Sequence, residues 1–111
     1  MDLGLSNALR STLVGWAKIL ADEVGEDAIT SNIVLPDRVA TKRITFLDEK
    51  KAAREGRSVE EGRAESLAAI PAGRYGDPEE YADVAAVLAS TRASNITGSM
   101  IRGDGGYISN V

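Results

Sequence analysis

The segment where a ligand site is first expected is Pro36–Thr41, which reads Pro-Asp-Arg-Val-Ala-Thr. It directly follows Ile29–Leu35, a short apolar and β-favouring stretch of the kind that is buried in a parallel sheet. Pro36 ends that stretch, because proline cannot donate the next ladder hydrogen bond and restricts the residue before it. In open α/β sheets, ligands bind outside the carboxyl ends of the strands. If the protein binds a small molecule, the sequence therefore predicts a contact with Pro36–Thr41.

A long amphipathic helix is expected to precede the strand. Residues Leu5–Val24 place large apolar side chains at helical spacing, namely at Leu5, Leu9, Leu13, Trp16 and Leu20. The polar turn Asp22–Asp27 follows, so helix, turn, strand and loop make half of a crossover unit. Gly15 lies inside this helix at a cost of about 1 kcal/mol relative to alanine. It indicates either the close approach of another helix or a tolerated substitution, and the apolar face is wide enough for a partner helix besides a sheet.

Two charged helices are expected after the loop, and together they make a lid-like segment, residues 41–70. The first covers Thr41–Gly56, and its run Asp48–Glu55 is typical of a solvated helical face. The second begins at Ser58, which forms a capping box with Glu61, and runs toward residue 70. Because both helices carry few large apolar residues and many charges, we interpret them as a mobile lid rather than as core.

The rest of the chain predicts one more helix and one more strand. A turn-rich linker, residues 71–76, leads to Asp77, an N-cap that is followed by Pro78 in the first turn. The helix that starts there ends near Ser90. A polar connector, residues 93–98, then leads to the strand Ser99–Arg102 and to a tight glycine-rich loop, residues 103–106.

Composition limits the protein to one modest domain of a soluble class. The chain has 111 residues, of which 43% are hydrophobic, and it carries a net charge of −4. That charge gives no electrostatic support to a nucleic-acid partner or to an anionic membrane. With no cysteine there is no disulfide framework and no thiolate chemistry, and we assign no residue to a metal. The start lacks a secretory pattern and no apolar run could span a bilayer, so a cytoplasmic protein is expected.

Several motifs nevertheless point to one family. Residues 74–82 read Arg-Tyr-Gly-Asp-Pro-Glu-Glu-Tyr-Ala, residues 93–98 read Ala-Ser-Asn-Ile-Thr-Gly, and residues 104–106 read Asp-Gly-Gly. Together with the helix around residues 15–21 and the strand and proline of residues 31–36, these stretches resemble the C-terminal half of a short-chain dehydrogenase/reductase. They come in the family's order over essentially the whole chain, and the nearest similarity is to the 3-oxoacyl-carrier-protein reductases.

The resemblance implies an α/β fold, the C-terminal half of a doubly wound parallel-sheet (Rossmann-like) domain with two parallel strands and several helices. On this view residues 1–111 form the C-terminal part of one such domain, with residues 41–70 shaping the substrate side. The implied activity is hydride transfer between NAD or NADP and a carbonyl or alcohol. The implied contacts between subunits lie on the helix 5–24 and in the C-terminal strand region, so a homo-oligomer is expected.

The family's proton-transferring Tyr-x-x-x-Lys motif falls on Ser6 and Arg10 when residues are counted back from Gly15. A phenol with a pKa of about 10 can be brought toward neutrality by a nearby cation, but an aliphatic hydroxyl is a far weaker acid. Arginine cannot give up its proton to relay it, although Arg10 could still bind a ribose hydroxyl of the cofactor. An N-terminal serine and an exposed helical arginine with no catalytic role are the alternative interpretation of these two positions.

The segment Pro36–Thr41 resembles the family's Pro-Gly-x-x-x-Thr loop, which wraps the nicotinamide. Pro36 and Thr41 match, whereas glycine is replaced by Asp37, a residue type that tolerates a left-handed conformation. The resemblance implies that backbone groups around Val39 and the hydroxyl of Thr41 contact the carboxamide or the pyrophosphate. An ordinary connection between strand and helix is the alternative.

No glycine-rich phosphate-binding turn between a strand and a helix occurs in this sequence. The cofactor's phosphates would therefore lack a binding turn on this chain alone, and a missing N-terminal half is one candidate partner. Three interpretations stay open. The chain is part of a short-chain oxidoreductase that is inactive in isolation, a non-enzymatic dimerisation module, or a ligand-binding relative with a degenerate active site.

Overall fold

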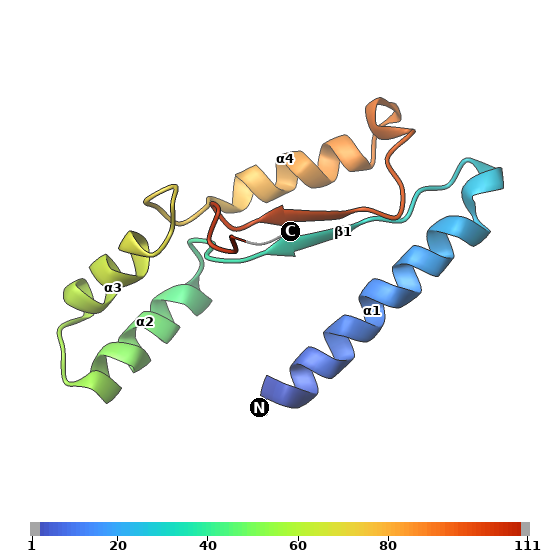
Figure 1. Cartoon of the computed structure of the whole chain (residues 1–111). Coiled ribbons are helices and arrows are strands. Elements are labelled where there is room, and N and C mark those ends of the chain that lie inside the picture. Colours follow the sequence, from blue (N-terminus) through green and yellow to red (C-terminus); the bar gives the residue numbers. More distant parts are fainter. Residues whose placement is uncertain (1–2, 110–111) are drawn as a thin grey trace. The chain divides into compact units, whose positions relative to one another are not determined.

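The computed structural model describes residues 3–109, and the described part of the chain contains helices and one pair of strands (Figure 1). In chain order the elements are α1 (Leu3–Glu23), η1 (Gly25–Asp27), β1 (Ile33–Pro36), α2 (Lys42–Glu55), α3 (Val59–Ala68), α4 (Pro78–Leu88), η2 (Thr91–Ala93) and β2 (Met100–Gly103). The described residues divide into two units. One unit comprises residues 3–35 and 84–101, and the other comprises residues 36–83 and 102–109.

β1 and β2 lie side by side and run in the same direction (Figure 1). The N–H of Ile33 donates to the carbonyl of Ser99 over 2.9 Å, and four residues further along the N–H of Asp37 donates to the carbonyl of Gly103 over 3.2 Å. Equal steps on both strands are the pattern of a parallel ladder. The expected α/β class with two parallel strands is therefore confirmed.

β1 is shorter than the predicted strand Ile29–Leu35, because it begins only at Ile33. Ala28 ends the η1 turn in a left-handed conformation, with φ 58°. The next residues pair through side chains rather than through a ladder: Asn32 Nδ2 donates to the carbonyl of Ile96 over 2.7 Å, and Asn32 Oδ1 accepts from the N–H of Ser99 over 3.2 Å. The residues of this stretch are also less buried than predicted, since Ile29 is exposed and Ile33 is only partly covered.

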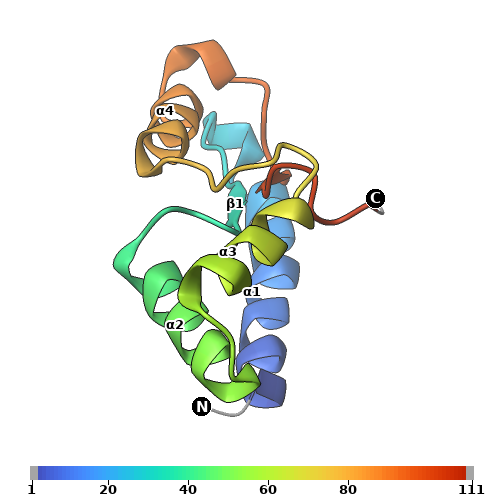
Figure 2. The ribbon, with the colours of Figure 1, turned by 90° about the vertical axis from the view of Figure 1, so that its left-hand side faces the viewer.

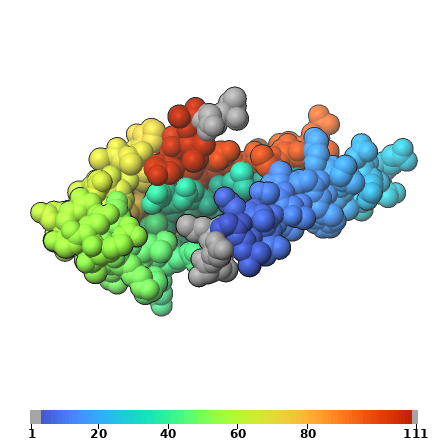
Figure 3. All heavy atoms as spheres, turned by 60° about the horizontal axis from the view of Figure 1, so that its bottom comes forward, coloured from blue at the N-terminus to red at the C-terminus, as the bar shows by residue number. Residues whose placement is uncertain are grey.

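α1 covers almost the whole of the predicted helix 5–24, and only small side chains of it are buried. Ala17 and Ala21 are 7% and 6% exposed, and close to them Lys18 Nζ donates to the carbonyl of Gly98 over 3.4 Å. The apolar stripe of the helix is uncovered among the described residues, at Leu5, Leu9, Leu13, Trp16 and Ile19. Figure 3 shows the atoms of α1 (blue) at the surface along the helix.

α2 and α3 pack side by side as a hairpin, seen in both ribbon views (Figures 1 and 2). Ala52 of α2 is 1% exposed and faces Gly62 of α3, where an added Cβ would lie 3.6 Å from the Ala52 Cβ. Small residues at the crossing let the two backbones approach. The two predicted helices of segment 41–70 are therefore present, and the predicted capping box is formed: Ser58 Oγ accepts from the N–H of Glu61 over 3.2 Å, and Glu61 Oε2 accepts from the N–H of Ser58 over 3.1 Å.

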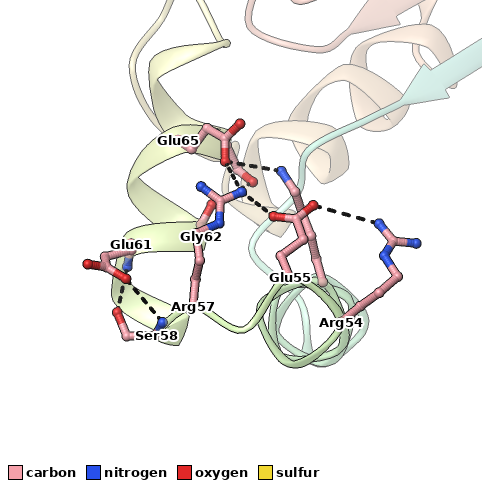
Figure 4. Close-up of polar contacts among 9 residues, drawn as sticks. Arg54, Glu55, Arg57, Ser58, Glu61, Gly62 and Glu65 are labelled. Atoms are coloured by element: carbon pink, nitrogen blue, oxygen red, sulfur yellow. Dashed lines mark hydrogen bonds and ion pairs between the residues drawn. The ribbon is translucent and has the colours of Figure 1, made fainter.

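The turn between these helices carries a network of ion pairs (Figure 4). Arg57 bonds the carboxylates of Glu55 and Glu65, and Lys51 Nζ lies 3.6 Å from Glu65 Oε2. The hydrogen bond from Arg57 is the main reason that the pKa of Glu55 lies below its ordinary value. These groups are at the surface, so the network contributes little to stability.

The C-terminal turn is fixed by one buried carboxylate. Asp104 is 7% exposed, and its two oxygens accept from the N–H groups of Gly106 over 2.9 Å and of Ile108 over 3.0 Å. Burial acts to raise the pKa of Asp104, but these bonds to the charged form bring that pKa below its ordinary value. Gly105 has φ 65°, and an added Cβ there would lie 2.7 Å from Ile70 Cγ2, so the turn requires glycine.

Candidate functional site

The loop that follows β1 joins the linker before α4 by backbone hydrogen bonds. The N–H of Gly76 donates to the carbonyl of Arg38 over 2.9 Å, and the N–H of Ala40 donates to the carbonyl of Gly76 over 2.8 Å. These bonds make a parallel bridge between Val39 and Gly76. The loop is therefore held at both ends, by β2 at Asp37 and by the linker at Val39.

Tyr81 of α4 also holds the same loop, near its first residues. Its hydroxyl donates to the carbonyl of Asp37 over 3.3 Å. Its ring leaves no room for a side chain at Gly103, where an added Cβ would lie 2.8 Å from Tyr81 Cε1. Burial raises the pKa of the Tyr81 phenol, so the hydroxyl stays a donor at neutral pH.

The left-handed residue of this loop is Arg38, with φ 55°, and not Asp37 as the sequence predicts. Asp37 contributes in another way, since its Oδ1 accepts from the N–H of Arg38 over 2.8 Å. The Arg38 guanidinium lies 4.6 Å from the centre of the Tyr107 ring. A positive φ at a residue other than glycine costs on the order of 1–3 kcal/mol, so the surrounding bonds hold Arg38 in a strained position.

Two polar groups of the loop have no hydrogen-bond partner among residues 3–109, namely the N–H of Val39 and the hydroxyl of Thr41. Neighbouring groups are paired: the carbonyl of Val39 accepts from the N–H of Thr41 over 2.8 Å, and the carbonyl of Thr41 accepts from Thr45 Oγ1 over 3.4 Å. Thr41 is exposed and Val39 is partly covered. The loop thus has one backbone donor and one hydroxyl that make no hydrogen bond to another described residue.

Two cavities adjoin the loop within the same unit. One has a volume of about 310 Å³ and is lined by Ala40 and Thr41 of the loop, by Thr45 and Asp48 of α2, and by Arg63 of α3 and Tyr75. The other has a volume of about 420 Å³ and is lined by Arg38 of the loop, by Asp48 and Lys51 of α2, by Glu65 and Ser66 of α3, and by Tyr107. Both volumes suit a small organic molecule.

Asp48, which lines both cavities, and Tyr75, which lines the 310 Å³ cavity, form a buried hydrogen bond. The Tyr75 hydroxyl donates to Asp48 Oδ2 over 2.7 Å, and each residue is 7% exposed. Burial, and next the bond to the carboxylate, raise the pKa of Tyr75. The sequence had assigned Asp48 to a solvated helical face, and that assignment was wrong, because Tyr75 arrives from far along the chain to cover it.

Ser6 and Arg10 lie one turn apart in α1, and Arg10 Nε donates to Ser6 Oγ over 3.3 Å. Arg10 is exposed and Ser6 is partly covered. A hydroxyl that accepts from a guanidinium keeps its own proton free for donation, but the acidity of an aliphatic alcohol remains far below that of a phenol. These two residues belong to the first unit, and Pro36, Asp37, Val39 and Thr41 belong to the second.

The sequence predicts Pro36–Thr41 as a candidate ligand loop but does not predict the residues that support it. Arg38 was part of the loop without a role of its own, and Tyr81 was noted only as part of a family motif. Gly76 and Tyr81 both lie in the motif of residues 74–82, so that motif was the available signal.

Among the described residues, no cluster of acidic or other ligating side chains could hold a metal ion. No helix in residues 3–109 combines the length and the apolar character needed to cross a bilayer.

A family model described as "Enoyl-(Acyl carrier protein) reductase" matches residues 3–108. Among curated proteins, the chain is 37% identical over 99 residues to the 3-oxoacyl-[acyl-carrier-protein] reductase of Vibrio cholerae, and 36% identical over 99 residues to that of Escherichia coli K12. Each match covers 89% of this chain and 36% of the relative. The chain therefore spans little more than a third of the length of these relatives.

Solved structures of short-chain dehydrogenases and reductases also match this chain. A short chain dehydrogenase family protein from Francisella tularensis matches with a TM-score of 0.83 and 29% identity, over 90% of this chain and 41% of that protein. YwfH, an NADPH dependent reductase involved in bacilysin biosynthesis, matches with a TM-score of 0.83 and 31% identity, over 91% of this chain and 38% of that one. Actinorhodin polyketide ketoreductase, solved with NADPH, matches with a TM-score of 0.82 and 31% identity, over 90% of this chain and 38% of that enzyme.

Proposed function

The chain belongs to the short-chain dehydrogenase/reductase family and is similar to the 3-oxoacyl-[acyl-carrier-protein] reductases, and on that premise we propose that it supplies the nicotinamide side of an NAD(P)-dependent oxidoreductase site. The observation that carries the proposal is the loop Pro36–Thr41, which is fixed at both ends and keeps two polar groups unpaired.

The unpaired N–H of Val39 and the hydroxyl of Thr41 fit the nicotinamide side of such a cofactor. An amide N–H can donate to the carboxamide oxygen, and a threonine hydroxyl can donate or accept. Pro36 and Asp37 shape the turn, and Tyr81 holds the carbonyl of Asp37 in place. When bound, the cofactor supplies the hydride, and this chain orients the face from which that hydride leaves.

The pyrophosphate is a different matter, since this sequence contains no glycine-rich turn to bind it. We propose that the turn is supplied by a further polypeptide segment that completes the sheet beside β1 and β2. The exposed edges of a two-stranded sheet are suited to such pairing.

The second group that this chain lacks is the acid that would transfer a proton to the substrate. Reduction of a carbonyl needs an acid at its oxygen, and the family's tyrosine position is Ser6 in this chain. Arg10, whose Nε donates to Ser6 Oγ, has further N–H groups that can donate to a ribose hydroxyl, but it cannot release a proton for relay. The chain alone is therefore proposed to lack reductase turnover.

The test is NADPH oxidation, followed by absorbance, with the purified 111-residue chain and a carbonyl substrate such as acetoacetyl thioester. The expected rate equals that of buffer. A rate above buffer that falls in the variant Thr41→Val would refute the proposed inactivity, and a rate that is equal in both would come from a contaminant.

A second candidate function is association through α1. Its five uncovered apolar side chains, Leu5, Leu9, Leu13, Trp16 and Ile19, are 57–62% exposed and share one face of the helix. An added Cβ at Gly15 would meet nothing within 4 Å, so no described residue packs closely on this glycine, and a second copy of the chain has room to do so. Met100 of β2 is also exposed, which suits a second contact in the C-terminal strand region.

Sedimentation measurements test this association. Leu9→Lys places a charge in the stripe and is expected to shift a dimer of the chain toward monomer. Asn7→Lys adds the same charge on the opposite side of the helix and is expected to leave the oligomer unchanged. A wild-type chain that is monomeric at all concentrations would exclude this role.

A further inference from the structure

Arg38 is the least satisfied charged group beside the 420 Å³ cavity. Its Nε is buried without a hydrogen-bond partner, and no hydrogen bond from its guanidinium reaches another described residue. The nearest carboxylate oxygen is Asp37 Oδ1 at 3.8 Å, which is beyond hydrogen-bond distance and already accepts the backbone N–H of Arg38. A buried donor of a charged group without an acceptor is costly, so the protein retains it at the expense of stability.

The strained backbone points in the same direction. Arg38 has φ 55°, a conformation that glycine adopts readily and an arginine does not. It is held by the N–H of Gly76, which donates to the carbonyl of Arg38, and by the Asp37 carboxylate, which accepts from the N–H of Arg38. The guanidinium lies over the ring of Tyr107. Strain of this kind concentrates where a side chain must be presented in a fixed direction.

The carboxylates of the cavity are not free to neutralise Arg38. Asp48 accepts the Tyr75 hydroxyl over 2.7 Å and is buried. Glu65 lies 2.6 Å from Arg57 and 3.6 Å from Lys51. The cavity therefore contains two acids that already have partners, and one guanidinium that lies 3.8 Å from Asp37 Oδ1 and makes no hydrogen bond to another described residue.

The other polar lining groups already have partners: Lys51 Nζ lies 3.6 Å from Glu65 Oε2, and the Ser66 hydroxyl donates to the carbonyl of Gly62 over 3.0 Å. Apolar surface comes from Leu47, Ala69 and the ring of Tyr107. The guanidinium of Arg38 therefore carries the argument, since the fork of an arginine is suited to bind both oxygens of a carboxylate or phosphate. Apolar wall beside this guanidinium would contact the carbon chain that carries the anion.

We propose that this cavity binds the anionic group, a carboxylate or a phosphate, of a small organic substrate, with Arg38 as the residue that determines this specificity. The inference rests on the proposed function in one respect, namely that Arg38 stands next to the loop residues assigned to the nicotinamide, so that a ligand held there is a substrate. Binding of the anion itself does not require the cofactor.

The experiment is a calorimetric or NMR titration of the 111-residue chain, without cofactor, with three probes. Acetoacetate carries a carboxylate, its methyl ester has the same carbonyl without the charge, and inorganic phosphate represents the other anion. Saturable binding is expected for at least one of the two anions and not for the ester. Binding of acetoacetate alone identifies the carboxylate, and binding of phosphate alone identifies the phosphate.

Two arginine variants localise the binding. Arg38→Gln is expected to weaken the anion's affinity about tenfold or more, because charge-assisted hydrogen bonds are lost. Arg43→Gln removes the same charge from an exposed position of α2 and is expected to bind as the wild type does. Circular dichroism checks that each variant is folded.

Equal binding of ester and acid would overturn the proposal, as would no binding of either anion to the wild-type chain, or an affinity that Arg38→Gln leaves unchanged. The comparison of acid with ester uses only the wild-type chain, so it decides the matter even if Arg38→Gln does not fold. Anion binding in a chain that fails to bind NADPH would count against the proposed function alone.

Discussion

Glu80, in the first turn of α4, binds two residues of the segment before the helix, Arg74 and Asp77. Its carboxylate accepts from Arg74 Nη1 over 2.8 Å, from Arg74 Nη2 over 2.7 Å, and from the N–H of Asp77 over 2.7 Å. The paired bonds from Arg74, and next the backbone bond from Asp77, lower the pKa of Glu80 to about 2. One side chain thus closes the start of the helix and fixes the linker that carries Gly76.

This lowered pKa predicts a pH-dependent stability. Because the pKa of Glu80 is about 2 in the folded chain and 4.5 in the reference state, its contribution is complete above about pH 4.5 and is lost as the pH falls toward 2. Glu80→Gln is therefore expected to lower the free energy of unfolding at neutral pH and to make little difference at pH 2. Urea denaturation of both chains over this pH range measures the effect.

Glu79→Gln is the matched control, since Glu79 is exposed and has no hydrogen bond or ion pair with another described side chain. It is expected to leave the free energy of unfolding nearly unchanged at every pH. A destabilisation by Glu80→Gln that stays constant down to pH 2 would contradict the assignment.

The Tyr81 hydroxyl gives a second prediction at single residues. Tyr81→Phe removes the bond to the carbonyl of Asp37 but keeps the ring that contacts Gly103 and Gly76. We expect a loss of about 0.5–1 kcal/mol in the free energy of unfolding, because the bond is long and partly exposed. Hydrogen exchange is expected to speed up selectively at the amide of Ala40, which bonds across the loop.

An unchanged exchange rate at Ala40 with a large global destabilisation would show that Tyr81 acts through core packing instead. Tyr107→Phe serves as the comparison, because its hydroxyl makes no hydrogen bond to another described residue. That variant is expected to leave the Ala40 amide unaffected.

Among the elements, α3 depends most on its ends. It has only ten residues, contains Gly62, and begins with a complete capping box between Ser58 and Glu61. Ser58→Ala removes the side chain that accepts the Glu61 N–H, so a loss of about 1 kcal/mol is expected in the free energy of unfolding. Thermal or urea denaturation measures it.

Ser11→Ala is the control on α1, where the serine is exposed within a helix and alanine is the better helix former. That change is expected to be neutral or slightly stabilising. Equal destabilisation by both substitutions would mean that the cap of α3 contributes nothing.

Local signals predicted the elements well where they act within a few residues. The capping box at Ser58, the proline after Asp77 and the periodic stripe of α1 each depend on neighbours along the chain, and the structure confirms α1, α3 and α4 close to the expected bounds. The predicted start of the strand Ile29–Leu35 was wrong for a local reason that the residue types do not indicate. A left-handed Ala28 and the side-chain bonds of Asn32 delay the ladder to Ile33.

Contacts between distant segments could not be predicted from single positions. Asp48 and Tyr75 stand 27 residues apart, and nothing around Asp48 distinguishes it from its solvated neighbours. Likewise, the Tyr81 bond to Asp37 spans 44 residues. The loop itself was found because proline, strand and family motif coincide there, whereas its supports depend on tertiary packing.

Across the whole chain, family membership and the loop fit together, while the cofactor's phosphate turn and the tyrosine acid are not in the sequence. We therefore propose that this chain forms part of the site, with the nicotinamide contacts at Val39 and Thr41. Restoring the Tyr and Lys motif by Ser6→Tyr and Arg10→Lys is not expected to create turnover in this chain alone, because the phosphate turn would still be missing.

The most direct test of this account is an amide chemical-shift map of the isotope-labelled chain during a titration with NADPH. Saturable shifts are predicted at the amides of Val39, Ala40 and Thr41, with a dissociation constant of about 1 mM or weaker, since only one side of the cofactor is held. Titration with adenosine monophosphate, which lacks the nicotinamide, is predicted to leave these amides in place. An unshifted Val39 amide at the highest NADPH concentration, or equal shifts with both compounds, would contradict the assignment of the loop.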